Sequence, residues 1–286
     1  SVPIAALTGP IADPEAAMAS LRERMSAALA GIADTRYQAA LDDSTLDYLD
    51  GGVELSPWAP YQFVYDPPVK PDRAEDEQYA TSIITPLRET VNNAESELLI
   101  ASPYFVLLDE NIEKAGERVE DGVDITVITN SLASTNHNIV HSGYAPTRKK
   151  LLKAGVKIYE TRPDARIAGV DNQTESKSSL HTKAFIVDRR WFYLGSFNWD
   201  PRSTYINTES GVIIDSPMIA SEVAERTDLL LPTAAYQVYL DEKDRLRWKT
   251  LDADGREIVF SKDPETSWWT RFKVSLMSLL PLDNQL

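Results

Sequence analysis

Short apolar segments alternate with amphipathic segments from residue 77 to residue 231, and this alternation constrains the fold more than any other feature of the chain. The apolar segments have the length of buried strands, and the segments between them repeat apolar residues at helical spacing. The expected strands are 97–101, 123–129, 156–160, 180–187, 191–194 and 208–214, and the expected helices are 78–94, 111–120, 144–154 and 217–230. The pattern predicts an α/β fold, a layered mixed β-sheet flanked by helices. Ligands of such folds bind beyond the carboxyl ends of strands, where Ser102 and Asn130 stand.

Two flanking regions differ from this central domain of residues 77–231. Residues 1–76 hold eight of the seventeen prolines and are expected to form a connector. It contains one amphipathic helix, from Asp13 to about Gly31, and one strand at 61–65. Residues 232–286 are predicted to form a small β-meander and a terminal amphipathic helix. The expected meander strands are 236–240, 246–249 and 257–260, and the expected helix is 267–280.

Composition excludes several kinds of site. Cysteine is absent, which excludes disulfides, thiolate metal sites and cysteine nucleophiles. With three histidines in the chain, a histidine-rich metal site is not expected, and no cofactor is implied. The net charge of −15 counts against nonspecific binding to nucleic acid, so no specific nucleic-acid partner is expected. The chain has no run of eighteen apolar residues, so we expect no transmembrane helix.

One polar pattern stands out against this background, in the segment 180–209. His181 and Lys183 are two residues apart in an expected strand, so their side chains point to the same side and can meet one phosphate. Asp188 has the opposite parity. It is therefore interpreted from the strand pattern as structural, bonding turn amides near Arg189 and Arg190.

Three further residues complete the pattern. Ser196 and Asn198 share parity and can donate hydrogen bonds to phosphate oxygens. Glu209, in a neighbouring strand, can accept from the second ring nitrogen of His181 and fix its tautomer. A lone His-x-Lys is common by chance and usually marks a solvated strand end. The whole constellation instead favours a site that cleaves phosphodiesters, with no metal implied because the histidine and lysine supply the nucleophile and the charge neutralisation.

His181-x-Lys183 with Asp188, followed by G-S-F-N and N-T-E, resembles the motif of the phospholipase D superfamily. S-P-Y-F at 102–105, N-S-L-A at 130–133 and V-H-S-G-Y at 140–144 are similar to the C-terminal half of bacterial cardiolipin synthases of the C type. The resemblance places His181, Lys183, Asp188 and Glu209 in the catalytic set. It places Lys183, Ser196, Asn198 and His141 on the substrate phosphates. For His141 the alternative is a helix-start histidine bonded to backbone.

The resemblance also implies a mechanism. Two His-x-Lys motifs face each other across a pseudo-twofold axis; one histidine attacks phosphorus to form a phosphohistidine, and the other protonates the leaving alcohol. Phosphatidylglycerol and a second phospholipid would then give cardiolipin. The implied partners are a phospholipid substrate and, peripherally, the bacterial cell membrane surface.

This chain departs from the pattern because it has one His-x-Lys motif, not two: neither His137 nor His141 is followed by lysine at the second position. The second motif is expected from a missing N-terminal half or from a second copy in a homodimer. Two alternatives stay open. One is a phospholipase D-type phosphodiesterase or nuclease that acts as a homodimer, and the other is a catalytically incomplete half that binds lipid.

Two helices carry further expectations. The basic run Arg148, Lys149 and Lys150 is interpreted as a solvated helix face, with binding of anionic lipid as the alternative. The terminal helix, which begins with Trp268 and Trp269, has the pattern of an interfacial membrane helix, and docking of its apolar stripe on the domain is the alternative.

Overall fold

The computed structural model describes residues 13–33, 58–67, 82–164, 179–252 and 254–279, and the chain forms two compact units, 1–58 and 59–286. The first unit contains α1 (Pro14–Ala33). This helix begins as expected at Asp13, whose Oδ1 accepts a hydrogen bond of 2.9 Å from the backbone N–H of Ala16. The expected loop at 162–179 lies mostly outside the described residues.

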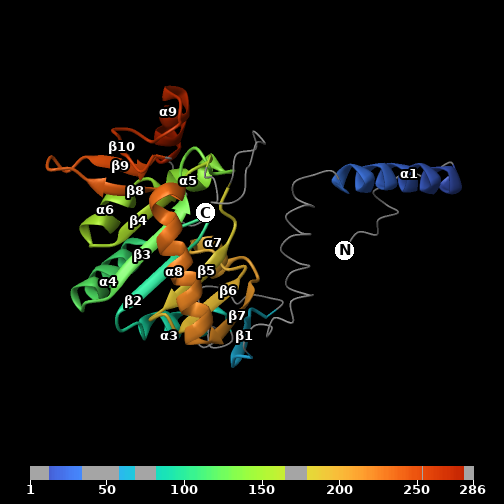
Figure 1. Ribbon diagram of the computed structural model, residues 1–286. Coiled ribbons are helices and arrows are strands. Elements are labelled where there is room, and N and C mark those ends of the chain that lie inside the picture. The colour runs from blue at the N-terminus through green and yellow to red at the C-terminus, as the bar shows by residue number, and fades with distance from the viewer. Residues whose placement is uncertain (1–12, 34–57, 68–81, 165–178, 253, 280–286) are drawn as a thin grey trace. The chain divides into compact units, whose positions relative to one another are not determined.

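The second unit is built on one ten-stranded sheet with the order β1-β7-β6-β5-β2-β3-β4-β8-β9-β10 (Figure 1). β2, β3 and β4 are parallel to one another, and every other neighbouring pair is antiparallel. The strands are β1 (Tyr61–Tyr65), β2 (Glu97–Ala101), β3 (Asp124–Asn130), β4 (Lys157–Thr161), β5 (Lys183–Val187), β6 (Trp191–Gly195), β7 (Ser210–Asp215), β8 (Ala235–Leu240), β9 (Leu246–Leu251) and β10 (Glu257–Phe260). The predicted mixed sheet is therefore confirmed.

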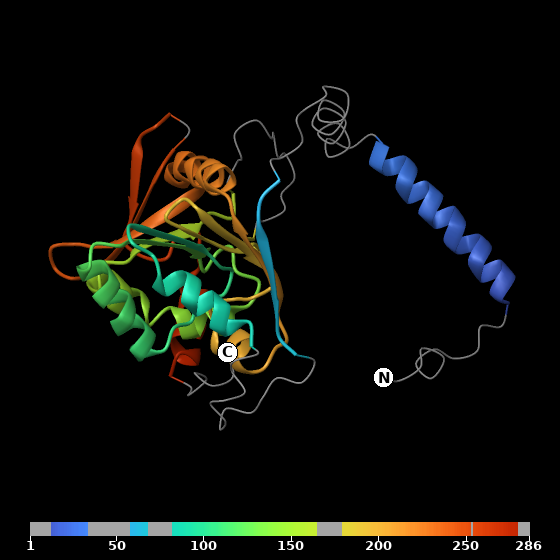
Figure 2. The same ribbon diagram turned by 90° about the horizontal axis from the view of Figure 1, so that it is seen from below.

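Helices cover both faces of this sheet (Figure 2). They are α3 (Ile84–Asn92), α4 (Asp109–Glu120), α5 (Asn138–Tyr144), α6 (Arg148–Lys153), α7 (Pro201–Tyr205), α8 (Pro217–Ala234) and α9 (Trp268–Met277). α3, α4 and α6 cover one face and α8 covers the other (Figure 2). Leu98 and Ile100 belong to the larger core, whereas Leu99, between them, belongs to the smaller core with Ala220 and Ala224 of α8. Burial on both faces explains why the central strands are continuously apolar.

The end of the first flanking region and the meander of the second both join the same sheet. Phe63 of β1 pairs with Val212 of β7, and Val238 of β8 pairs with Ile158 of β4. The larger compact unit consequently begins at Ala59, not at residue 77, because the alternating strand 61–65 supplies main-chain partners to the edge of β7. The meander likewise extends the sheet beyond β4.

The predicted basic helix 144–154 corresponds to α6, which begins later, at Arg148, while residue 144 is the last residue of α5, a helix that was not predicted. Arg148 does not lie on a solvated face. It is buried, and its Nη1 lies 3.2 Å from Glu160 Oε1 and 2.7 Å from Asp263 Oδ1. The reason is that a buried carboxylate pair needs a cation. Within the described ranges, no helix has the length and apolarity needed to span a bilayer.

Candidate active site

Segments that are distant in the sequence meet at one edge of the sheet. β5 is antiparallel to β2, with Ala184 opposite Ala101, so the start of β5 lies beside the end of β2. β3 is parallel to β2, which brings its last residue, Asn130, to the same edge. The end of β6 at Gly195 and the start of β7 at Ser210 arrive there as well. Ligands of α/β folds bind at such an edge.

The structure brings His181 and Lys183 together at the start of β5. Lys183 Nζ donates a hydrogen bond of 2.9 Å to the carbonyl oxygen of His181 and lies 3.4 Å from its Nδ1. Lys183 is buried and His181 is exposed. Burial lowers the pKa of Lys183, and the nearby carboxylates of Glu209 and Asp200 counter part of that effect. An exposed imidazole next to a poorly solvated ammonium group forms a site that can bind an anion.

The carboxylate of Glu209 is held by two serine hydroxyls. Ser196 Oγ donates to one carboxylate oxygen, and Ser203 Oγ donates to the other at 2.8 Å. Among the hydrogen bonds of the described residues, none joins Glu209 to His181, in contrast to the expectation that Glu209 orients that ring. The reason is local, because Ser203 at the start of α7 and Ser196 after β6 both reach Glu209 just before β7. The Ser196 hydroxyl is accordingly engaged with protein and not directed to a phosphate.

Asn198 lies in the turn that follows β6. Its backbone N–H donates to Ser203 Oγ at 3.2 Å, so the same serine that holds Glu209 also fixes the backbone of Asn198. The side chain is buried, yet its Oδ1 has no hydrogen-bond partner. A buried amide oxygen without a partner is unusual in a folded protein. Because Oδ1 is an acceptor, it suits a donor group of a ligand, such as a hydroxyl, and not a phosphate oxygen.

Asp188 lies at the opposite end of β5 from Lys183, about 16 Å away at the usual strand rise. Its Oδ1 accepts hydrogen bonds from the N–H of Ser96 at 2.8 Å, the hydroxyl of Ser96 at 2.8 Å and the N–H of Glu97 at 2.9 Å. Its Oδ2 accepts from the N–H of Glu95 at 2.9 Å. Asp188 therefore anchors the start of β2. This placement corrects its assignment to the catalytic set and also the expectation that it bonds its own turn.

The pKa of Asp188 reflects this anchoring. Burial raises it, but the backbone amides of Glu97, Glu95 and Ser96 outweigh that effect and lower the pKa below its ordinary value. The backbone of Asp188 itself has a positive φ of 51°. Aspartate tolerates this left-handed conformation better than most residues, which suits it to the sharp turn between β5 and β6.

His141 lies on α5 with 3 % of its surface exposed. Burial lowers its pKa to about 3, and the nearby Arg148 cation lowers it further, so the imidazole is neutral at physiological pH. Its ring centroid lies 5.4 Å from that of Tyr144. Its Nε2 has no hydrogen-bond partner among the described residues, and the expected contact of His141 with a substrate phosphate stays a prediction.

Three residues outside the predicted set fix the site. Asn130 Oδ1 accepts from the N–H of Leu180 at 2.9 Å, and its Nδ2 donates to the carbonyl of Leu180 at 3.0 Å, so it clamps the residue before His181. Ser102 Oγ accepts from the N–H of Trp199 at 3.2 Å. Both follow the ends of predicted strands, and that position was the only signal the sequence held for them.

The third positioning residue is Asp66, which comes from the predicted connector. Its Oδ2 accepts from the backbone N–H of Glu209 at 2.9 Å, and its Oδ1 accepts from the hydroxyl of Ser82 at 2.8 Å. Asp66 thus ties the end of β1 to the start of β7 and to the residues before α3. No local pattern marked it as a site residue, because its partners are distant in the chain.

Comparisons with known proteins add to this geometry. The family described as "Cardiolipin synthase, PLD-like domain" matches residues 87–230. The chain is 35 % identical to cardiolipin synthase C of Escherichia coli (strain K12), in an alignment covering 87 % of this chain and 53 % of that protein. It is 29 % identical to cardiolipin synthase A of Pectobacterium carotovorum over 48 % of this chain and 25 % of that protein. The chain therefore spans about half the length of the first of these curated relatives.

Solved structures show a weaker likeness. The phospholipase D family member Nuc from Salmonella typhimurium is 14 % identical, with a TM-score of 0.45, over 64 % of this chain and 99 % of that one. The phosphatidylserine synthase of Haemophilus influenzae is 13 % identical, with a TM-score of 0.47, over 79 % of this chain and 46 % of that one.

Proposed function

The chain belongs to the family of cardiolipin synthase PLD-like domains, and from this premise we propose that it is half of a phosphatidyltransferase acting through a phosphohistidine. The reaction would form cardiolipin from phosphatidylglycerol and a second phospholipid. The observation that supports this most is the contact between the exposed His181 and the buried Lys183 ammonium, 3.4 Å apart at the edge of the sheet. A nucleophile and a phosphate-binding cation are thereby placed at one point.

In the proposed reaction, an imidazole nitrogen of His181 attacks phosphorus and forms a P–N bond, while the bond from phosphorus to the leaving alcohol breaks. Lys183 Nζ and the Nδ2 group of Asn198 donate to the non-bridging oxygens, whose charge grows in the transition state. The hydroxyl of the acceptor lipid then attacks phosphorus and releases His181. Glu209 acts through Ser203, which it shares with Asn198, and is a positioning residue.

The leaving alcohol needs a proton, and we propose that a second His-x-Lys half supplies the acid, either from the same longer protein or from a second copy of this chain. This chain has one such motif, and its relatives are about twice as long. His141 cannot replace the missing acid because it is buried and neutral. β1 also exposes the aromatic side chains of Tyr61, Phe63 and Tyr65, and an uncovered apolar row of this kind is typical of an interface.

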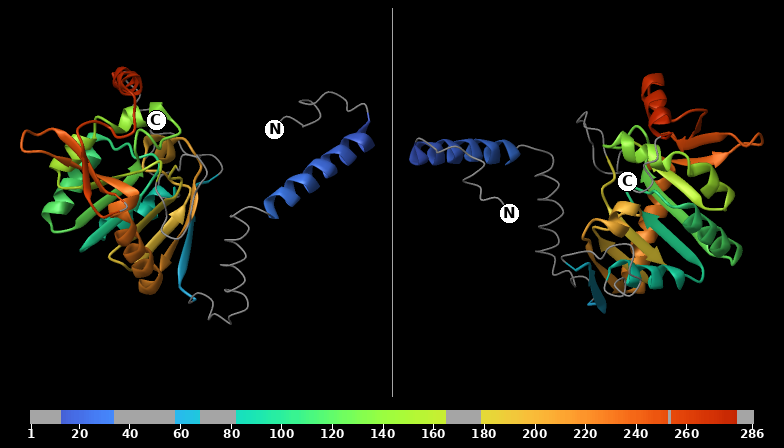
Figure 3. Two further views of the ribbon diagram at one scale, coloured as in Figure 1. Left: turned by 45° about the horizontal axis from the view of Figure 1, so that its top comes forward. Right: turned by 180° about the vertical axis from the view of Figure 1, so that it is seen from behind.

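We further propose that α9 holds the protein peripherally on the bacterial membrane that contains its substrate. Val274 packs inward, whereas Trp268 and Trp269 are 58 % and 62 % exposed. α9 lies beside α5 (Figure 3), which follows β3 and so stands at the same end of the sheet as His181. Tryptophans on an exposed helix face favour the interface of a bilayer. Vesicle sedimentation of a Trp268→Ala/Trp269→Ala variant should show reduced binding; unchanged binding would remove this role.

A substrate with an activated leaving group tests the chemistry of this half alone. A phosphatidyl ester of 4-nitrophenol needs no general acid, because the nitrophenolate leaves without a proton. We expect a burst of nitrophenolate and a phosphatidyl adduct on His181, detected by intact mass and peptide mapping. His181→Gln should abolish both, while His137→Gln, which alters another exposed histidine, should retain both.

The results of this assay distinguish a transferase half, a half that only binds lipid and a phosphodiesterase. Absence of both burst and adduct in folded protein would reject the nucleophilic role and favour a half that only binds lipid. A steady release without a trapped adduct, giving phosphatidic acid, would indicate a phosphodiesterase that uses water. Either result would leave the family membership unchanged.

A further inference from the structure

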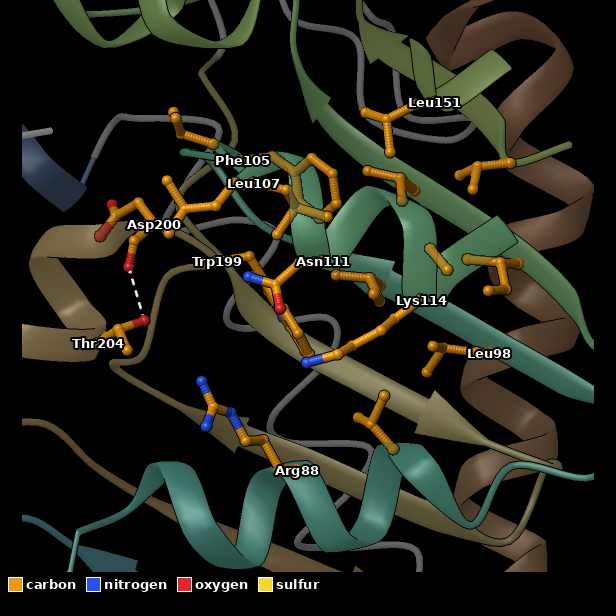
Figure 4. Close-up of a pocket in the computed structure, with 18 of the residues that line it drawn as sticks. Arg88, Leu98, Phe105, Leu107, Asn111, Lys114, Leu151, Trp199, Asp200 and Thr204 are labelled. Atoms are coloured by element: carbon orange, nitrogen blue, oxygen red, sulfur yellow. Dashed lines mark hydrogen bonds between the residues drawn. The ribbon is translucent and has the colours of Figure 1, made fainter. Parts of the chain in front are cut away.

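A cavity of about 350 Å³ lies between the sheet and the helices α3 and α4 (Figure 4). Its inner wall consists of buried apolar side chains on β2 and β3 and in the loops that follow the strands, including Leu98, Ile100, Phe105 and Val127. An apolar cavity of about 150 Å³ already binds benzene, and pockets for small ligands begin at about 300 Å³. This cavity therefore has room for a ligand with an extended apolar part.

Three basic residues line this apolar cavity, and one of them, Arg118, forms an ion pair with Asp121. Arg88 of α3 and Lys114 of α4 line the cavity from opposite sides (Figure 4). Both are exposed, and neither forms an ion pair or hydrogen bond within the described part of the chain. Asp200 is the one carboxylate among the lining residues; it is buried and accepts a 2.6 Å hydrogen bond from the N–H of Ser203. The two unpaired cations are available to an anion.

We propose that this cavity binds a single-chain anionic amphiphile, a fatty acid or a monoacyl phospholipid. The chain lies along the apolar wall, and the carboxylate or phosphate meets Arg88 and Lys114. A neutral apolar molecule would leave both cations unused, and a small anion would leave the apolar wall uncovered. Only a ligand that combines the two properties matches the whole cavity.

The cavity adjoins the proposed catalytic site, but ligand binding in the cavity does not require catalysis. Phe197, Trp199 and Asp200 line the cavity, and Asn198 lies within this run. A bound chain therefore contacts the segment that positions Asn198. Binding itself needs neither turnover at His181 nor a second His-x-Lys half, so it can be measured on this chain even if the proposed transferase activity fails its test.

Quenching of tryptophan fluorescence provides a direct assay, because Trp199 is part of the wall. We expect 9,10-dibromostearate, added below its micelle concentration, to quench saturably, and the quenching to disappear in Trp199→Phe. Displacement by stearate, monoacyl phosphatidylglycerol and stearyl alcohol then compares the head groups. Tighter binding of the monoacyl lipid would identify a phospholipid as the source of the chain, and tighter binding of stearate would identify a free fatty acid.

Substitutions test the apolar wall and the two cations of the cavity separately. Ala115→Phe places a ring in the cavity and should weaken binding of every chain about tenfold or more. Val91→Phe does the same from α3 if the first variant does not fold. Arg88→Glu combined with Lys114→Glu should weaken stearate about tenfold and leave stearyl alcohol unchanged. Lys243→Glu, an exposed lysine on the turn between β8 and β9, is the matched charge control and should bind as wild type.

Two results would overturn the proposal. One is the absence of saturable quenching in folded wild-type protein. The other is wild-type affinity in a folded cavity-filling variant, with an unchanged melting temperature as the control for folding. Equal loss of stearate and stearyl alcohol in the charge variant would reject the role of Arg88 and Lys114.

Discussion

The two ends of β5 carry the two parts of one sequence pattern, and they are built in opposite ways. At the first end, His181 is exposed, Lys183 is a buried cation with a lowered pKa, and the neighbouring Asn198 Oδ1 has no partner. At the other end, Asp188 accepts four hydrogen bonds from Glu95–Glu97. The first end has polar groups that are free to bind a ligand, whereas the carboxylate at the second end is fully hydrogen-bonded to the protein.

The difference shows that residues of one signature need not share one role. Unsatisfied buried groups lower stability and are retained where a ligand completes them. Saturated groups hold geometry, here the register of β5 against β2. A substitution at the first end should therefore affect chemistry more than stability, and a substitution at the second end should do the reverse.

The largest expected effect is on turnover in His181→Ala. In the assembled enzyme, loss of the nucleophile should lower activity by about four orders of magnitude. The free energy of unfolding should change by no more than about 0.5 kcal/mol, because the side chain is exposed. Activity assays and urea unfolding measure the two effects. An enzyme that keeps a tenth of its activity would contradict the proposed role.

Asp188→Ala should show the opposite pattern. Four hydrogen bonds to a charged group are lost, and partial exposure reduces their worth, so we expect the free energy of unfolding to fall by about 3 kcal/mol. Asp254→Ala removes an exposed carboxylate that is paired with Arg256 and should cost at most about 1 kcal/mol. Equal losses in the two variants would deny Asp188 its anchoring role.

The same anchor predicts a pH dependence. The folded pKa of Asp188 lies below its ordinary value of 3.8, so its contribution is present above that pH and is lost as the pH falls through the folded pKa. In acid unfolding followed by circular dichroism, Asp188→Asn should therefore differ from wild type most at neutral pH. The difference should shrink below about pH 4. A difference that grows toward acid would have the wrong sign.

Asn130→Asp tests whether the hydrogen bonds between Asn130 and Leu180 hold His181 in place. The variant keeps the acceptor for the N–H of Leu180 but places an oxygen against the carbonyl that Nδ2 now contacts. We expect a loss of about 2 kcal/mol in stability and about a tenfold fall in kcat, with KM nearly unchanged. Asn93→Asp, at an exposed asparagine that follows α3, is the control. A fall in stability alone would limit Asn130 to a structural role.

Lys183→Met should give a small change in stability, and its sign is informative. The folded pKa of Lys183 lies below 10.5, so its charge opposes folding at neutral pH and stability rises with pH between the folded pKa and 10.5. The variant should thus be slightly more stable than wild type at pH 7, by less than about 1 kcal/mol. Urea midpoints at pH 7 and above pH 10.5 measure it. A destabilised variant would show that the ammonium is well paired.

Local patterns predict the elements well but not their long-range partners. The apolar strands β2 to β7 and the meander strands follow from the sequence, because run length and alternation are local properties. That Val238 of β8 would pair with Ile158 of β4 could not be predicted, since pairing of distant strands leaves no local signal. The start of the expected helix 144–154 was placed too early: α6 begins at Arg148, after Pro146, and the short helix α5 before it was not predicted.

The candidate site divides in the same way. Strand parity predicts that His181 and Lys183 share one side. In the structure β5 begins at Lys183, so His181 lies before the strand, and the two side chains meet there with 3.4 Å between Lys183 Nζ and His181 Nδ1. The partners of Asp188 and Glu209 could not be inferred, because Glu95–Glu97 and Ser203 reach them only through the fold. Strand alternation predicts the direction of a side chain but not the residues that it contacts in the fold.

The pairing of β1 with β7 has a consequence for the order of folding. Tyr61 pairs with Ile214, so the contact closes one of the longest loops in the sheet, and such contacts form late because loop closure costs entropy. During synthesis β1 must wait until β7 has left the ribosome. Asp66 reaches the backbone of Glu209 only when β1 has paired with β7. Completion of the end of the sheet that carries His181 and Lys183 is therefore coupled to one of the last steps of chain assembly.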